Sequence, residues 1–255
     1  MNRLLIGSIT AFYLTMVLGC GGSSDDEGDP TPPIDLDLTL YECSKGLDTT
    51  DGNAYVYVYN VDIGGVLTDQ VTEYYTVADF IDFEGTMYSR TVKTVDYATL
   101  DENDYTMDNY FLFDVDSNLY VEHAWVFDDY DVRFSPGRTV NLGLKPGDSF
   151  TTTYEETRNY DSGADPKVYS VTSRQTFTEI KDYTFGPHTI TGCFVTHEIT
   201  KVDEDGKETS ATLDVVYDIN SGWQFLVQAN GNLTHEPLSL TVNGSAIPFE
   251  PAPVP

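Results

Sequence analysis

Alternating side chains dominate this chain from Tyr55 onward. Tyr55, Tyr57 and Tyr59 fall on one face of an extended strand, and the valines between them fall on the other. A period of two residues indicates β-strands, and its clean alternation is typical of antiparallel sheets with one packed and one solvated face. Helical periodicity does not extend beyond a few turns. We therefore expect an all-β, mainly antiparallel fold with few or no helices, built as a strongly curved sheet, a half-barrel or a sandwich.

Turn-forming residues divide this region into hairpins. The segments 111–115 and 119–127 flank a polar tripeptide, and two later strands meet at Asp205-Gly206, a dipeptide typical of tight hairpin turns. The stretch Val77–Phe83 fits either a strand or a short helix. In the first hairpin, strict alternation predicts one shared face for Leu119, Val121, His123, Trp125 and Phe127.

The N-terminal region has the composition of an export signal followed by a linker. A basic start and a mostly apolar run occupy residues 1–19, and residues 20–33 are rich in Gly, Ser, Pro and acids. The apolar run is shorter than the roughly 20 residues that a membrane-spanning helix needs. We expect a signal peptide at 1–19, a linker at 20–33, a single antiparallel β domain at 34–247 and a flexible tail at 248–255.

Cys20 follows the apolar run directly, and the sequence Val17-Leu18-Gly19-Cys20 resembles a bacterial lipobox. In that family the signal is removed before the cysteine, which then carries fatty acyl chains such as palmitate. Two chains give stable anchoring, at about 0.8 kcal/mol for each buried CH₂ group. Gly21, rather than Asp, comes next, and by resemblance to Gram-negative lipoproteins this favours the outer membrane over the inner membrane. The alternative is an ordinary signal peptide or a single anchor helix with Cys20 unmodified.

A second resemblance lies in the C-terminal third. A turn at Gly186-Pro187 leads into a strand with Cys193, a hairpin follows, and residues 217–223 (YDINSGW) join two further strands. This order is similar to that of LolA/LolB-like open antiparallel barrels, many of which have a Gly-containing turn before a strand with Cys and an aromatic-turn-Gly junction near the end. The resemblance rests on spacing, so it implies a fold class and no activity.

Acidic residues outnumber basic ones by 42 to 13, which gives a formal net charge of −29. Nucleic-acid binding depends on Lys and Arg that neutralise phosphates, so this charge excludes DNA and RNA as partners and disfavours anionic lipid headgroups. Cations and a basic protein remain as charged partners. The alternative explanation is solubility alone, including in a salty habitat where the repulsion is screened.

Cys43 and Cys193 remain once Cys20 is lipidated, and in an oxidising compartment two cysteines allow one disulfide. Closing a loop of about 150 residues removes roughly 4–5 kcal/mol of unfolded-chain entropy. The alternative is two unpaired thiols, with Cys193 buried as a small apolar residue. Neither cysteine has a second Cys or His at a metal-ligand spacing.

One group of acidic residues has a calcium-like pattern. Asp114, Asp116 and Asn118 begin like a calcium-binding loop. Leu119, however, stands where an EF-hand has Gly, and Trp125 stands where it has Glu. An EF-hand is therefore excluded, which leaves a surface Ca²⁺ site of loop oxygens or simply a charged tight turn. The histidines have no metal-binding spacing, and we expect no other metal or cofactor.

The sequence assigns no catalytic residue, because it contains neither a phosphate-binding loop nor a nucleophile elbow. Trp125 and Phe127 are candidates for aromatic residues that face an apolar or sugar ligand, although such faces are more often core. We expect a membrane-anchored lipoprotein of the bacterial cell envelope with a non-enzymatic binding or structural role. The alternatives are a carrier of an apolar ligand or lipid, and an envelope hydrolase acting on glycans or peptides.

Overall fold

The computed structural model of the protein describes residues 38–44, 52–63, 66–100, 103–185, 188–231 and 233–251. The predicted signal segment, the linker and Cys20 lie outside these residues. Within them there is no helix long and apolar enough to cross a membrane. In chain order the elements are α2 (Leu40–Ser44), β1 (Ala54–Ile63), β2 (Val66–Phe83), β3 (Thr86–Tyr97), β4 (Tyr105–Asp114), β5 (Leu119–Phe127), β6 (Tyr130–Asn141), β7 (Ser149–Tyr160), β8 (Lys167–Phe185), β9 (His188–Asp203), β10 (Glu208–Asp218), β11 (Gln224–Ala229), β12 (Leu233–Val242), β13 (Ser245–Ile247) and β14 (Glu250–Pro251).

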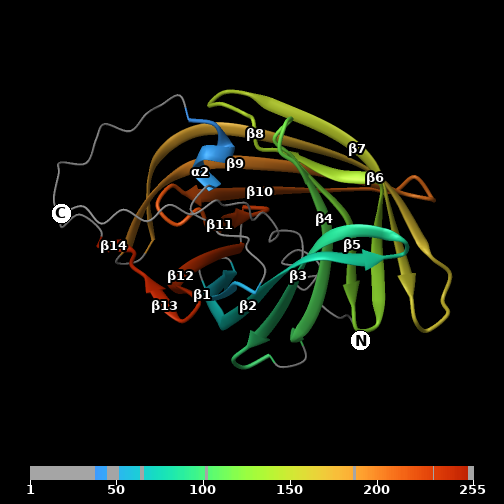
Figure 1. Cartoon of the computed structure of the whole chain (residues 1–255), viewed down its shortest axis with the longest axis horizontal. Helices are drawn as coiled ribbons and strands as arrows, with labels where there is room; N and C mark the ends of the chain where they lie inside the picture. Colours follow the sequence, from blue (N-terminus) through green and yellow to red (C-terminus); the bar gives the residue numbers. More distant parts are fainter. Residues whose placement is uncertain are drawn as a thin grey trace.

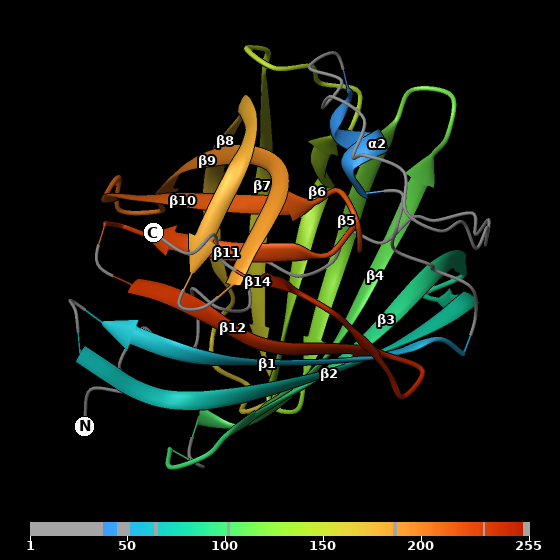
Figure 2. The ribbon, with the colours of Figure 1, turned by 90° about the vertical axis from the view of Figure 1, so that its left-hand side faces the viewer.

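The strands of the described ranges form one antiparallel sheet, in which each strand from β1 to β13 pairs with the next along the chain. β14 lies off this path and pairs with β9. The sheet curves so strongly that β1 also pairs with β12, from Tyr55 opposite Val242 to Ile63 opposite Leu233. Figures 1 and 2 show this curvature from two perpendicular directions. The predicted all-β, strongly curved sheet is confirmed, and it is a single sheet rather than a two-sheet sandwich.

The face turned into the curve, which we call the inner face, carries the core. Tyr55, Tyr57 and Tyr59 of β1 are each 1% exposed or less, as their alternation predicts. β7 alternates in the same way, with exposed Glu155 next to buried Glu156. Large aromatic side chains bury the most apolar area per residue and therefore dominate the energetics of such a core.

α2 lies at one end of the sheet, which we call the helix end (Figure 2). Its first turn is capped in both directions. The Thr39 N–H donates to Glu42 Oε2 at 2.7 Å, and the Glu42 N–H donates to Thr39 Oγ1 at 3.3 Å. The Leu40 N–H donates to the carbonyl oxygen of Leu144 at 2.9 Å, which fixes α2 to the segment after β6.

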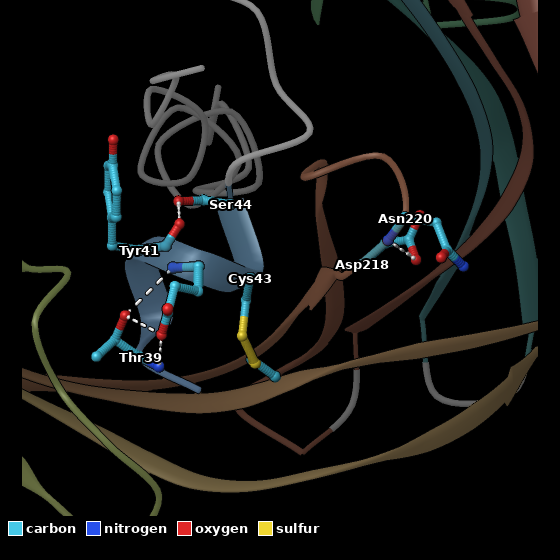
Figure 3. Close-up of a disulfide and its surroundings, with 8 residues drawn as sticks. Thr39, Tyr41, Cys43, Ser44, Asp218 and Asn220 are labelled. Carbon is cyan, nitrogen blue, oxygen red and sulfur yellow. Dashed lines mark hydrogen bonds between the residues drawn. A yellow bond between two sulfur atoms is a disulfide. The ribbon is translucent and has the colours of Figure 1, made fainter. Parts of the chain in front are cut away.

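A disulfide joins Cys43 of α2 to Cys193 of β9, as Figure 3 shows. The two Cα atoms are 6.2 Å apart, although 150 positions separate them in the sequence. Beside the bridge, a Cβ added to Gly192 would lie 2.5 Å from the backbone oxygen of Tyr217. Only glycine therefore allows the close approach of β9 and β10 at this point. The bridge that the cysteine count allows is present, and it holds α2 against the sheet.

β5 departs from strict alternation. A bulge between Glu122 and Ala124 shifts its register with β6, so the residues on either side of the bulge exchange faces. Trp125 consequently lies on the inner face with Glu122, and its Nε1–H donates to Glu122 Oε1 at 3.4 Å. Strict alternation predicted one shared face for Leu119, Val121, His123, Trp125 and Phe127. That prediction is wrong, because the bulge interrupts the alternation within the strand.

The ambiguous stretch Val77–Phe83 belongs to β2 and is strand rather than helix. A register shift between Ala78 and Ile81 interrupts its pairing with β3, and Phe80 has a φ of 43° there. This local irregularity explains why the stretch does not alternate cleanly.

Part of the C-terminal tail is held against the sheet, in contrast to the flexible tail predicted for 248–255. Phe249 packs against Phe185 and Phe225, with ring centres 5.9 and 5.7 Å apart. Glu250 then pairs with Thr189 at the start of β9. Hydrophobic burial of one aromatic ring orders this part of the tail, and residues 252–255 lie outside the described ranges.

Candidate ligand-binding site

Ionised side chains are buried on the inner face of the sheet. Glu73, Glu122 and Glu156 are each 1% exposed, and each carboxylate has a cationic partner. Burying a charge is unfavourable unless a partner and hydrogen bonds compensate for it, so apolar residues would fill a core more cheaply. The ion pairs that the described residues form on this face are Glu73–Lys93, Glu122–Arg138, and Glu156 with both Arg158 and Lys201.

Strand register brings Glu73 and Lys93 together. Glu73 of β2 lies opposite Tyr57 of β1, and Tyr75, two residues along β2, lies opposite Lys93 of β3. The Lys93 ammonium nitrogen lies 2.8 Å from Glu73 Oε1. The hydroxyls of Tyr59 and Tyr75 donate to the two oxygens of the same carboxylate, at 2.8 and 2.7 Å. Glu73 is therefore compensated by one cation and two hydroxyl donors.

Burial fixes the protonation of these tyrosines. It raises the pKa of Tyr59 and of Tyr75 well above the ordinary value, and the charge of Glu73 adds to the effect. Burial lowers the pKa of Lys93, while the attraction of Glu73 opposes that change. The tyrosine hydroxyls thus remain hydrogen-bond donors over the whole accessible pH range.

Several buried polar atoms around this ion pair have no hydrogen-bond partner within the described ranges. They are Tyr57 Oη, Thr91 Oγ1, Tyr105 Oη, Asn109 Oδ1 and His235 Nε2. An unpaired buried polar atom costs about 1–3 kcal/mol, and folded proteins contain few of them. A group of such atoms on one patch is therefore unusual for a core that serves the fold alone.

These atoms lie on neighbouring strands. The His235 ring of β12 stacks on Tyr59 of β1 with 4.2 Å between ring centres. The Lys93 ammonium lies 5.9 Å from the ring centre of Tyr105 on β4. Thr91 and Asn109 face each other across the β3–β4 pairing. We call the following set the inner polar cluster: Tyr57, Glu73, Thr91, Lys93, Tyr105, Asn109 and His235.

His235 is neutral in this setting. Burial, with a smaller contribution from the charge of Lys93, lowers the pKa of His235 to about 3. A neutral imidazole has one donor and one acceptor nitrogen. With His235 uncharged, Glu73 and Lys93 are the ionised members of the cluster and their charges cancel.

A second ionised group lies on β7 and β9. Arg158 donates from Nε to Glu156 Oε1 at 2.9 Å, and the Lys201 ammonium donates to Glu156 Oε2 at 2.5 Å. The Tyr169 ring centre lies 5.4 Å from the Arg158 guanidinium and 5.9 Å from the Lys201 ammonium. Burial lowers the pKa of Lys201 to about 8, against the attraction of Glu156. Two cations on one carboxylate give this group a local excess of positive charge.

A row of aromatic rings connects the two ionised groups. Tyr105 lies 5.9 Å from Phe127, Phe127 stacks on Tyr130 at 4.4 Å, and Tyr130 lies 6.2 Å from Tyr160. These rings come from the ends of β4 to β7 that point away from the helix end. Phe127, a predicted ligand-facing aromatic, stands in the middle of this row.

Trp125, the other predicted ligand-facing aromatic, is engaged by a third ionised pair. Its indole lies next to Glu122, and the Arg138 guanidinium lies 5.4 Å from its ring centre. Arg138 also pairs directly with Glu122. The Phe134 ring packs against the indole in a T-shaped arrangement, with 4.8 Å between the ring centres. Trp125 is thus a packed part of the inner face.

The calcium candidate forms a self-contained turn. Asp114 accepts hydrogen bonds from the Ser117 hydroxyl at 2.5 Å and from the Asp116 N–H at 3.1 Å. Asn118 has a φ of 53°, which suits a tight turn. The hydrogen bonds occupy the carboxylate that the calcium prediction requires. Clusters of three or more His, Cys, Asp or Glu side chains able to hold a metal do not occur in the described residues.

Sequence reasoning missed the inner polar cluster. Its members are isolated polar residues on strands, and only the sheet register brings Glu73 and Lys93 together from positions 20 residues apart. One signal was available. Glu73 stands between Val71 and Tyr75 on the face that period two marks as buried, where an acid needs a partner.

Comparison of the chain with protein-family models, with curated proteins and with solved structures found no match. The similarity of the C-terminal third to LolA/LolB-like proteins, and that of residues 17–20 to a lipobox, therefore stay predictions.

Proposed function

We propose that the protein is a membrane-anchored lipoprotein of the bacterial cell envelope whose inner face binds a small polar ligand without catalysing a reaction. The unpartnered polar atoms of the inner polar cluster are the observation that carries the binding role. A core with a structural role alone would pair these atoms with one another or replace them with apolar groups. The anchor is an independent part of the proposal and rests on the lipobox-like residues around Cys20.

A carrier of lipid or of another apolar ligand is the second candidate. The row of rings from Tyr105 to Tyr160 favours it, because aromatic side chains commonly line apolar sites. A hydrocarbon chain, however, would leave Asn109 Oδ1 and the hydroxyls of Tyr57 and Tyr105 without hydrogen-bond partners. The polar composition of the inner face therefore supports a polar ligand better.

A hydrolytic role is less well supported. Acid catalysis needs a carboxyl group that is free to give or take a proton beside the substrate. Glu73 is occupied by Lys93, Tyr59 and Tyr75, and Glu156 is occupied by two cations. These contacts hold the carboxylates as structural anions, which suits binding rather than proton transfer.

Native mass spectrometry of the full chain, purified in mild detergent from cells that naturally contain it, tests the binding role. We expect one small polar molecule per chain, released when the chain unfolds. Tyr105→Phe should retain less of it, because this variant removes an unpartnered hydroxyl and little else. The binding role is contradicted if the chain carries no molecule and takes up none from an extract of the cell envelope.

Incorporation of labelled palmitate by the full chain in a Gram-negative host tests the anchor. We expect the label in the wild type and in Ser24→Ala, a control in the same linker. Cys20→Ala should lose the label and leave the membrane fraction. Labelling that persists in Cys20→Ala would contradict the anchor and leave the binding role untouched.

A further inference from the structure

The outer face of β2 to β5 carries apolar side chains where a solvated sheet face is normally polar. Ile81 of β2 lies opposite Tyr88 of β3, and Leu112 of β4 lies opposite Val121 of β5. The pairing of β3 with β4 places Tyr88 next to Leu112. On β4 and β5 the residues beside them in the chain are buried on the inner face, so Leu112 and Val121 point outward. Four neighbouring strands thus contribute one apolar row to the outside of the sheet.

Two more aromatic rings extend this row. Phe83 stacks on Tyr110 with 3.9 Å between ring centres, and the Phe83 and Tyr88 ring centres are 6.3 Å apart. The Arg133 guanidinium lies 4.5 Å from the Phe83 ring centre. Tyr110 is only 7% exposed although it is not part of the contiguous buried core, so outer-face side chains cover it. We call the following set the outer apolar patch: Ile81, Phe83, Tyr88, Tyr110, Leu112 and Val121.

The corresponding row on β7 to β10 has the opposite composition. In register across these four strands it consists of Thr153, Thr172, Thr200 and Ser210. Hydroxyl side chains of this kind suit a face that is exposed to water. The apolar row on β2 to β5 is therefore a local feature and not a general property of the sheet. Contiguous apolar surface on a soluble domain indicates an interaction site.

No helix or strand of the described ranges covers the outer apolar patch. All the described strands belong to the one sheet, and α2 lies against β9 and β10. Leu112 is 38% exposed, and Phe80, which follows the patch into the β2 bulge, is 63% exposed. The φ of 43° at Phe80 is unfavourable for a residue with a side chain. A strained backbone that presents an aromatic ring to solvent suggests a role in binding.

Charge around the outer apolar patch limits what can bind there. The acidic residues that border it are Asp82, Glu84, Asp108, Asp114 and Asp131. Two arginines lie among them, and both are already paired with these acids. Arg90 is 3.4 Å from Asp108, and Arg133 is 2.6 Å from Asp131 and 3.0 Å from Glu84. Glu84 nevertheless remains 68% exposed. The border is therefore negatively charged, as is the whole chain.

We infer that the outer apolar patch is the docking surface for a basic segment of a partner protein, one that combines Lys or Arg with apolar side chains. The apolar side chains pack on the patch, and the cations meet the acidic border. A second copy of this chain or an anionic bilayer would bring like charge against that border and against the net charge of −29. This docking role is separate from the ligand proposed for the inner face.

Fluorescence anisotropy with three matched peptides tests the chemistry of the partner. The probe is an octapeptide of alternating Lys and Leu, and the two controls replace Lys with Glu or Leu with Ser. At physiological salt we expect saturable binding of the Lys-Leu peptide to the full chain, about tenfold tighter than that of either control. A Lys-Leu peptide that does not bind, or binds no more tightly than a control, would overturn the inference.

Surface variants locate the binding of this peptide. Leu112→Ser should weaken it about fivefold, whereas Leu112→Met, which keeps an apolar side chain of similar size, should retain it. Val66→Ser is the matched control, because Val66 is 67% exposed at the other end of β2. Glu84→Gln should weaken binding about threefold, and Glu204→Gln on the exposed β9–β10 turn should not. Equal affinities for all of these variants would place the peptide elsewhere and overturn the inference.

Two measurements on the unanchored Cys20→Ala chain separate the other occupants of the patch. We expect a monomer in analytical ultracentrifugation and no flotation with phosphatidylcholine vesicles. A dimer that Leu112→Ser dissociates would assign the patch to a second copy of the chain, and vesicle binding that Leu112→Ser abolishes would assign it to the bilayer. Either result would overturn the inference and leave the ligand of the inner face untouched.

Discussion

The interior of the curved sheet is filled differently at the helix end and in the inner polar cluster. At the helix end, Trp223 packs against Tyr55 and Tyr75 at 5.4 and 5.3 Å, and the Cys43–Cys193 bridge fixes α2. In the inner polar cluster, an ion pair and a group of unpartnered polar atoms occupy equally buried positions, whereas at the helix end the unpartnered Trp223 Nε1 sits among packed rings. Apolar burial stabilises a fold directly, whereas a buried ion pair contributes little or nothing net. The difference teaches that one region maintains the fold, whereas the other keeps polar groups that stability alone does not explain.

Removal of the disulfide should have the largest effect on stability. The double variant Cys43→Ala with Cys193→Ala should lower the free energy of unfolding by about 5 kcal/mol, because the bridge closes a loop of 150 residues. Urea unfolding followed by tryptophan fluorescence measures this value. Reduced wild-type protein is the control and should behave alike. A loss below about 1 kcal/mol would show that the disulfide does not make the helix end a stabilising region.

Acidification should act through two buried histidines on the inner face. Burial lowers the pKa of His197 and of His235 to about 3, below the unfolded value of about 6.5. The unfolded chain therefore takes up protons first as the pH falls, and stability is lost between about pH 6.5 and 3. Through these two histidines, the free energy of unfolding at pH 5 should be about 4 kcal/mol lower than at pH 8. The raised pKa of Asp218 acts in the opposite direction.

His235→Gln separates the contribution of the inner polar cluster from the rest of the pH dependence. This variant should reduce the loss between pH 8 and pH 5 by about 2 kcal/mol, since one of the two histidines is then absent. Urea unfolding at both pH values gives the comparison. An unchanged pH dependence would mean that His235 is already protonated or accessible in the folded protein.

Tyr75→Phe tests a partnered hydroxyl of the inner face. Its hydroxyl donates to the Glu73 carboxylate at 2.7 Å, and a hydrogen bond to a charged group contributes about 1.5–3 kcal/mol. We expect the free energy of unfolding to fall by about 2 kcal/mol. Chemical denaturation at neutral pH provides the measurement, and no change would show that Glu73 is compensated by other groups.

Tyr105→Phe should have the smallest effect on stability, and its sign should be opposite. Its hydroxyl has no hydrogen-bond partner in the described residues, so its removal should raise the free energy of unfolding of the ligand-free protein by about 1 kcal/mol. The same denaturation experiment compares the free energies of unfolding of Tyr105→Phe and Tyr75→Phe. A loss as large as that of Tyr75→Phe would show that the hydroxyl supports the fold, and the distinction between the two regions would disappear.

Sequence patterns predicted the fold well where alternation was regular. Tyr55, Tyr57 and Tyr59 marked the inner face correctly, and the hairpin turns fell where Asp, Asn, Ser and Gly cluster. The prediction failed at β5, where a bulge between Glu122 and Ala124 exchanges the faces. A bulge adds one residue without a distinctive sequence signal, so strict alternation carried the error along the strand.

The candidate site could not be predicted in the same way. Glu73 and Lys93 meet only because β2 and β3 pair in one register, and His235 approaches Lys93 only because β12 returns to β1. Local patterns report which face a residue occupies, but not which distant residue lies beside it. The ligand-facing role of Phe127 was predicted from its strand alone and stays a prediction, whereas its contacts with Tyr105 and Tyr130 required the structure.

High-resolution crystallography of the protein, purified from cells that naturally contain it, tests the central claim most directly. The account predicts an ordered polar molecule within hydrogen-bonding distance of Tyr105 Oη and Asn109 Oδ1. Side chains that bond one another across this region, with no guest between them, would contradict it.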